Sequence, residues 1–172
     1  MRLKDCHNFR DFRRLAEQRL PSPIFNYIDG GADDEVTMRR NTAAFEACDL
    51  VPSVLRGVTD VDLSVTVMGQ KIDLPVYLSP TALQRLFHHQ GERATAAAAE
   101  KFGTLFGVSS LGTVSMEELA KKHRTPQVYQ FYFHKDRGLN RAMMEKARQC
   151  GIKVMMLTVD SSTGGNREGD LR

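Results

Sequence analysis

Apolar and polar positions follow two different patterns along this chain, and the change falls near residue 74. After it, short and almost continuously apolar segments alternate with longer segments of helical spacing. The apolar segments cover residues 75–79, 104–110, 128–133 and 153–160, and the helical segments cover residues 91–102, 115–123 and 136–150. Strands that are apolar on both sides are typical of a parallel sheet covered on both faces. The pattern therefore predicts an α/β fold of repeating βα units.

Residues 1–60 carry a different pattern, which predicts a helical lead-in. Three segments have helical spacing: 11–20, 23–28 and 35–47. Pro21 ends the first, and Asp33 with Asp34 precedes the third. Apolar residues then alternate with polar ones before Gly69, at Val61, Leu63, Val65 and Val67. Such alternation predicts a half-buried hairpin, so we expect residues 61–172 to hold this hairpin and the βα units in a single domain.

Helix boundary signals agree with these segments. Ser115 and Glu118 have the spacing of a capping box, in which each side chain bonds the other residue's backbone N–H. Gly103 and Gly151 each follow a predicted helix end, and Pro126 closes the helix between them.

Charge and cysteine content exclude several classes of protein. The 24 basic and 21 acidic residues leave a net charge of +3, which is too mild to indicate nucleic-acid binding. Cys6, Cys48 and Cys150 are odd in number and widely spaced, which favours neither disulfides nor a zinc site and fits a reducing cytoplasm. No apolar stretch approaches the ~20 residues of a membrane span, although peripheral contact with the inner face of the cell membrane stays open.

Polar residues collect where the predicted strands end. They are Ser79, Pro80, Thr81 and Ala82; Ser109 and Ser110; Gln130 and Tyr132; and Thr158 and Asp160. Each alone is an ordinary loop-entry residue, but parallel βα folds gather their functional groups at this edge. Gln130 lies inside an apolar strand, where its amide needs hydrogen-bond partners. A planar polar ligand would supply them.

Other sites are not favoured by the sequence. No Gly-x-Gly-x-x-Gly or Gly-x-x-x-x-Gly-Lys-Ser/Thr motif follows a strand, which argues against a dinucleotide fold and a P-loop. His88 and His89 precede a helix and lack nearby metal-ligand spacing, so we interpret them as loop or capping residues and expect no metal site.

Five stretches together resemble the FMN-dependent α-hydroxy-acid dehydrogenases and oxidases. They are LPSPIFNYIDGGADDEVTMRRN, SPTALQRLFHHQGE, GVSSLGTVSMEELA, VYQFYFHKDRG and LTVDSSTGGNREGD, in the order and spacing of the family. The second and fourth look closest to the bacterial L-lactate dehydrogenase branch. The resemblance implies a (β/α)8 TIM barrel, of which this chain would hold the lead-in, the hairpin and the first four strands.

The resemblance also implies a cofactor site for FMN. The backbone of Pro80, Thr81 and Ala82 would run along the flavin ring, with the Ala82 amide directed at its reactive nitrogen. The pyrimidine edge of the ring would be bonded by Ser109, Gln130 and Thr158.

For a small 2-hydroxy-acid substrate, the resemblance implies four further residues. Tyr27 would bind the carboxylate, Tyr132 the hydroxyl, and Arg167 the carboxylate or product. Tyr27 taken alone would be a core aromatic with a satisfied hydroxyl. Asp160 would orient a histidine base.

The resemblance implies that the histidine base belongs to a His-x-x-Arg motif late in the barrel, and we expect this base to lie outside residues 1–172. We therefore expect this chain alone to be inactive, and the complete enzyme to oxidise L-lactate or a similar acid. Leu111 stands where plant-type oxidases have tryptophan, which favours a quinone or cytochrome over oxygen as electron acceptor. We also expect a homo-oligomer at full length.

Two alternatives stay open. One is another FMN- or phosphate-binding barrel, of the isopentenyl-diphosphate isomerase or inosinate dehydrogenase type, against which Tyr27 and Tyr132 argue. The other is a non-catalytic half-barrel that binds flavin or a partner. Four strands of an open barrel would leave bare edges, so we expect the isolated chain to be unstable or to self-associate.

Overall fold

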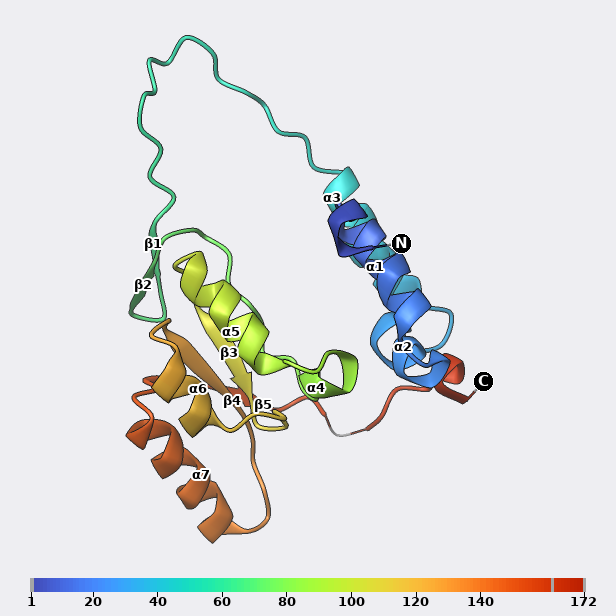
Figure 1. The fold of residues 1–172 in the computed structure, drawn as a ribbon, viewed down its shortest axis with the longest axis vertical. Coiled ribbons are helices and arrows are strands. Elements are labelled where there is room, and N and C mark those ends of the chain that lie inside the picture. The colour runs from blue at the N-terminus through green and yellow to red at the C-terminus, as the bar shows by residue number, and fades with distance from the viewer. Residues whose placement is uncertain (1, 162, 172) are drawn as a thin grey trace. The chain divides into compact units, whose positions relative to one another are not determined.

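The structure is a computed structural model that describes residues 2–161 and 163–171. It consists of two compact units (Figure 1). The first runs up to Gly57 and resumes at Thr163, and the second begins at Val58. No helix within the described residues is both long and apolar enough to cross a membrane.

Short helices build the first unit. They are the 3-10 helix η1 (Leu3–Asp5), α1 (Phe9–Arg19), α2 (Ser22–Asp29), α3 (Val36–Glu46) and the 3-10 helix η2 (Glu168–Leu171). The Asn8 side chain caps α1 by accepting a bond from the Asp11 N–H. An ion pair of 2.6 Å between Arg13 and Asp29 joins α1 to the end of α2. The three helical segments expected from the sequence are therefore present.

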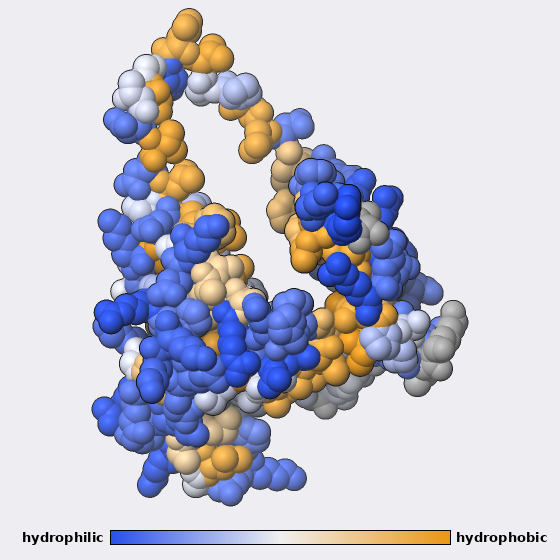
Figure 2. All heavy atoms as spheres, viewed as in Figure 1, coloured by the Kyte–Doolittle hydropathy of each residue, from blue (hydrophilic) through white to orange (hydrophobic). Residues whose placement is uncertain are grey.

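A strand-free segment separates α3 from the hairpin. Residues 48–64 contain neither helix nor strand, and Figure 2 shows apolar groups exposed along this segment. Val61 and Leu63, expected in the hairpin, are 75% and 55% exposed. The hairpin itself is shorter, with β1 (Val65–Val67) antiparallel to β2 (Gln70–Ile72). Both residues of its turn have positive φ, the geometry that twists two strands into a tight hairpin.

Three parallel strands form the sheet of the second unit, in the order β3 (Phe106–Ser109), β4 (Gln127–Tyr132), β5 (Val154–Thr158). Helices α5 (Glu92–Lys101), α6 (Met116–Lys122) and α7 (Arg137–Gln149) alternate with the strands and lie along one side of the sheet (Figure 1). The predicted βα alternation over this region is confirmed.

The strand predicted over residues 75–79 is reduced to one bridge. Leu78 pairs with Phe106, donating its N–H to the Leu105 carbonyl at 3.0 Å and accepting from the Gly107 N–H at 2.8 Å. Pro75 and Pro80 lack the N–H that a longer ladder requires. The short helix α4 (Gln84–Phe87) follows.

The two faces of the sheet are buried by different partners. One face packs against the helices, in a core of Ala96, Ala99, Phe106, Val108, Val114, Leu119, Tyr129, Phe131, Ala147 and Ile152. The other face is covered near the amino ends of the strands by the hairpin, where Ile72 packs on Leu105 and Val128. Side chains alternate along a strand, so Gln130 and Tyr132 share the face of Val128 beyond the hairpin. The polar end of that face is the candidate site.

The predicted burial of the last strand on both faces is only partly right. Val154, Met156 and Thr158 are half-buried, whereas Met155 and Leu157 on the other face are 41% and 50% exposed. Among the described residues, no strand pairs with the outer edge of β5.

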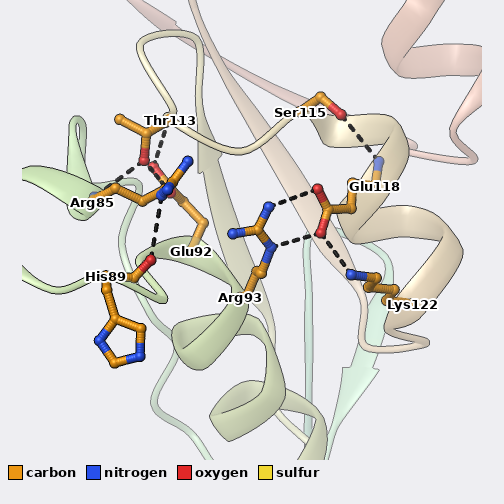
Figure 3. Close-up of polar contacts among 8 residues, drawn as sticks. All are labelled: Arg85, His89, Glu92, Arg93, Thr113, Ser115, Glu118 and Lys122. Carbon is orange, nitrogen blue, oxygen red and sulfur yellow. Dashed lines mark hydrogen bonds and ion pairs between the residues drawn. The ribbon is translucent and has the colours of Figure 1, made fainter.

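A further correction concerns the capping box expected at Ser115 and Glu118. The Ser115 hydroxyl accepts a bond from the Glu118 N–H as predicted, but the Glu118 carboxylate turns to Arg93 of α5, at 2.6 and 2.9 Å, and to Lys122, at 2.7 Å (Figure 3). Opposite charges on the neighbouring helix and one turn ahead compete for the carboxylate with the Ser115 backbone. Glu118 therefore joins α5 to α6 on their outer side.

Acid is expected to remove the contribution of this ion-pair cluster. Hydrogen bonds from Arg93 and Lys122 hold the pKa of Glu118 at about 2, below its ordinary value of 4.5. Because the folded pKa is depressed, the stabilisation is complete above pH 4.5 and disappears as the pH falls toward 2. Thermal unfolding of the Glu118→Gln variant should give a slightly lower midpoint than the unsubstituted chain at neutral pH, and the difference should vanish in acid. A difference that persists at the acid end would contradict this assignment.

Candidate functional site

A row of hydrogen bonds crosses the carboxyl ends of the three strands. The amide oxygen of Gln130 accepts from the Ser109 hydroxyl at 3.4 Å, and from the Ser110 hydroxyl and N–H at 3.2 and 3.3 Å. Its amide nitrogen donates to the Thr158 hydroxyl at 2.8 Å. Residues from β3, β4 and β5 are thus joined in one row, since parallel pairing sets Ser109 beside Gln130 and Gln130 beside Met156.

These partners correct one expectation from the sequence. Gln130 is 7% exposed, and protein groups already bond its amide oxygen and one of the two hydrogens of its amide nitrogen. The row nevertheless fits the edge of a neutral heterocycle. It is uncharged, and Thr158, which accepts from Gln130, keeps its own hydroxyl hydrogen for donation. The donors and acceptors present therefore suit the pyrimidine edge of a flavin.

The segment Pro80–Ala82 reaches this edge by a close approach to β3. A Cβ added to Gly107 would lie 2.4 Å from the Pro80 nitrogen and 2.9 Å from its Cα, so only glycine allows this crossing. The Leu83 N–H then donates to the Leu111 carbonyl at 3.1 Å, which ties the segment to the loop that follows Ser109.

The Gly107→Ala substitution is expected to displace Pro80 and its neighbours, because the backbone atoms that a methyl group would meet cannot rotate away. The expected loss of unfolding free energy is about 1–3 kcal/mol, the usual range for overpacking, and is measured by chemical denaturation. Gly164→Ala is the matched control, since nothing lies within 4 Å of the added Cβ there. Equal effects of the two substitutions would show that the crossing is not tight.

Two buried polar residues near this edge, Gln84 and Glu92, were not predicted from the sequence. Gln84 is 9% exposed, donates to the Thr81 carbonyl at 3.2 Å and accepts from the Thr95 hydroxyl at 2.5 Å. Glu92 is 1% exposed and accepts from Thr113. An acidic residue in the first turn of a helix is ordinarily explained by the helix dipole, so the sequence offered no separate signal for burial.

Two predicted substrate residues lie together in the first unit. The Arg167 guanidinium is 5.4 Å from the Tyr27 ring and donates to the backbone carbonyls of Asn26 and Tyr27 at the end of α2. Its Nε donates to Asp170 at 2.7 Å, and this bond raises the pKa of Arg167 above its ordinary value. Tyr27 and Arg167 are therefore in direct contact although they lie 140 positions apart in the sequence.

Tyr132 and Asp160 lie at the carboxyl edge of the sheet in the second unit. Tyr132 ends β4, is half-buried and is paired with Thr158, while Asp160 is exposed two residues beyond β5. The described residues bring together no group of three or more histidine, cysteine or acidic side chains that could hold a metal ion.

The His-x-x-Arg spacing occurs twice in this chain, at His7–Arg10 and His134–Arg137. His7 precedes α1. The backbone of His134 is bonded to Asn140, and its ring lies edge-on to Phe131, which belongs to the helix-covered core. Neither spacing lies late in the barrel, where the resemblance places the base.

Comparison with known proteins finds relatives that match nearly the whole of this chain. L-lactate oxidase from Nostoc sp. is 42% identical over 169 residues, which cover 96% of this chain and 46% of that protein. Glycolate oxidase 1 from Oryza sativa is 38% identical over 165 residues, covering 96% and 45%. The chain spans about half the length of the curated relatives it matches.

Solved structures that resemble this chain are also oxidases, and the chain again covers about half of each. A lactate oxidase from Pediococcus acidilactici aligns with a TM-score of 0.90 at 34% identity, covering 97% of this chain and 47% of that one. A mandelate oxidase aligns with a TM-score of 0.87 at 33% identity, covering 94% and 49%. Residues 16–172 match the family described as FMN-dependent dehydrogenase. The chain therefore belongs to the FMN-dependent dehydrogenase family, whose cofactor is FMN.

Proposed function

We propose that this chain supplies the ring-binding part of an enzyme that oxidises a small 2-hydroxy acid to the 2-oxo acid, and that its βα units are the first part of a (β/α)8 barrel. The observation that carries this is the neutral row from Ser109 through Gln130 to Thr158. These residues would hold the pyrimidine edge of FMN, beside the backbone of residues 80–82. Bound FMN would accept the two electrons that leave the substrate.

Tyr27, Tyr132 and Arg167 would bind the substrate. Mandelate oxidase structures include one variant altered at a tyrosine, solved with (S)-mandelic acid, and one altered at an arginine. Those two altered positions are 35 residues apart in that enzyme, and Tyr132 and Arg167 are 35 residues apart here. Arg167 and Tyr132 would hold the carboxylate and the hydroxyl, and Asp160 would orient a histidine base from outside residues 1–172.

L-lactate is the substrate to test first, because the lactate oxidase from Nostoc sp. is 42% identical and the glycolate oxidase from Oryza sativa is 38% identical. The relatives are named oxidases, which does not support the quinone or cytochrome acceptor expected from Leu111. Oxygen is therefore the first acceptor to test.

A chimera tests this function directly. Residues 1–172 joined to the remaining half of the Nostoc L-lactate oxidase would be loaded with FMN and mixed without oxygen with L-lactate, glycolate or (S)-mandelate. We expect L-lactate to bleach the visible flavin absorbance fastest, and the Tyr132→Phe chimera to be slower. A folded, FMN-loaded chimera that no 2-hydroxy acid reduces would refute the proposed activity. The chimera should quench FMN fluorescence on binding, and a folded chimera that does not bind FMN would refute the cofactor role of residues 1–172.

A further inference from the structure

We propose that Glu92, through its buried carboxylate, is a positioning residue that holds together two loops, one that carries the FMN-facing residues 80–82 and one that follows Ser109. Its relevance to the cofactor rests on the proposed function. One loop is residues 80–91, between the Leu78 bridge and α5, and the other is residues 110–115, between β3 and α6. Glu92 touches neither the predicted substrate residues nor the hydrogen-bonded row itself, and it acts through Thr113.

Glu92 is the first residue of α5, and its carboxylate points away from solvent toward the second loop (Figure 3). One carboxylate oxygen accepts the Thr113 N–H at 2.7 Å, and the other accepts the Thr113 hydroxyl at 2.6 Å. Two bonds to one residue fix both the place and the orientation of Thr113. The start of a helix also favours a negative charge there.

The carboxylate is ionised despite its burial. Loss of hydration would raise its pKa, but hydrogen bonds from the Thr113 hydroxyl and N–H, with help from nearby backbone groups, lower it below the ordinary value. An ionised carboxylate can only accept hydrogen bonds, so the Thr113 hydroxyl must donate to it. The hydroxyl oxygen is then left to accept from another group.

That other group belongs to the first loop. The Arg85 N–H donates to the Thr113 hydroxyl oxygen at 3.1 Å, and the Arg85 side chain donates to the His89 carbonyl at 3.3 Å (Figure 3). The orientation that Glu92 imposes on Thr113 is therefore the one that receives Arg85. Gly91 lets the loop close tightly, since an added Cβ there would lie 2.5 Å from the Arg85 side chain.

The connection continues from Thr113 to the polar row. The Gly112 N–H donates to the Ser109 carbonyl at 3.0 Å, and the Leu111 N–H donates to the Ser109 hydroxyl at 3.1 Å. Leu111 in turn accepts from Leu83 of the first loop. A shift of Thr113 would thus be passed to both sides of the site, to Ser109 on one and to residues 80–83 on the other.

Substitutions at Thr113 separate positioning from general stability, because this side chain is exposed and its replacement leaves the core intact. Thr113→Val removes the hydroxyl, and Thr113→Ser keeps it. In Glu92→Gln, an amide nitrogen replaces the carboxylate oxygen that faces the Thr113 hydroxyl. The hydroxyl hydrogen then has no acceptor. Glu118→Gln is the matched control, since it removes a carboxylate from the same helix pair on the outer side.

Two measurements on the chimera would be made for each variant, namely amide hydrogen exchange of Leu83, Arg85 and Thr113, and the FMN dissociation constant. In Glu92→Gln and Thr113→Val, exchange at these amides should be about tenfold faster and FMN binding about tenfold weaker, as expected for one lost hydrogen bond to a charged group. Thr113→Ser should restore both values, and Glu118→Gln should change neither.

Uniform loss of thermal stability, with exchange in both loops and FMN affinity unchanged, would overturn the positioning role. Failure of Thr113→Ser to differ from Thr113→Val would overturn it as well. If the unsubstituted chimera does not bind FMN, the proposed function fails, while the exchange rates still decide whether Glu92 orders the two loops.

Discussion

Replacing Phe131 by alanine is expected to lower the free energy of unfolding by about 3–5 kcal/mol, the range for a buried aromatic side chain. Phe131 is 1% exposed and belongs to the core between the sheet and its helices. Its ring lies 6.2 Å from Tyr129 and is edge-on to His134, so truncation loses aromatic contacts as well as buried area. Urea denaturation, followed by circular dichroism, measures the change.

Phe133→Ala is the matched control for this prediction. Phe133 lies two residues further along the same chain segment but is 55% exposed; the Arg137 guanidinium lies 4.8 Å from its ring centre, and its ring is edge-on to Phe131. An exposed cation–π pair contributes about 0.5–1 kcal/mol. Losses of similar size for the two variants would show that the helix-covered face is not the main core.

Replacing Gln130 by leucine is expected to weaken FMN binding by at least about tenfold, because leucine keeps the size of the side chain and removes every hydrogen bond of the polar row. Ser109 and Thr158 would lose their partner, which also lowers stability by about 1–3 kcal/mol. Fluorescence titration with FMN and urea denaturation measure the two effects.

The Gln130→Glu variant separates the effect of lost hydrogen bonds on FMN binding from the effect of an added negative charge. A glutamate would still accept from Ser109 and Ser110. It would also place a negative charge on an edge that suits a neutral ring, and it could no longer donate to Thr158. We expect it to fold better than Gln130→Leu and yet to bind FMN poorly. Normal FMN affinity in both variants would mean that the ring edge lies elsewhere.

Local patterns predicted most of the second unit. Continuous apolar runs predicted β3, β4 and β5, and Ser115 predicted the start of α6, because burial on both faces and helix capping are properties of neighbouring residues. The strand over residues 75–79 was overestimated, since apolar character outweighed the two prolines that interrupt its ladder.

Contacts between residues far apart in the sequence explain which features the sequence analysis did not predict. Glu118 has the spacing of a capping box, yet Arg93, 25 residues earlier, takes its carboxylate. Glu92 looks like a surface residue in the first turn of a helix, and only the fold brings Thr113 over it. Gln130 was correctly singled out as a polar residue in an apolar strand, whereas its protein partners depend on the register of three strands.

The contact of Arg167 with α2 has a consequence for synthesis of the chain. Arg167 donates to the Asn26 carbonyl across 141 residues, and Asn26 donates to the Gly169 carbonyl across 143. At ~5–20 residues per second, a ribosome needs roughly 7–28 s to make the intervening chain. During that interval the end of α2 lacks these partners, so the helical unit is completed only after the sheet has been translated. High contact order of this kind slows folding and prolongs exposure to chaperones.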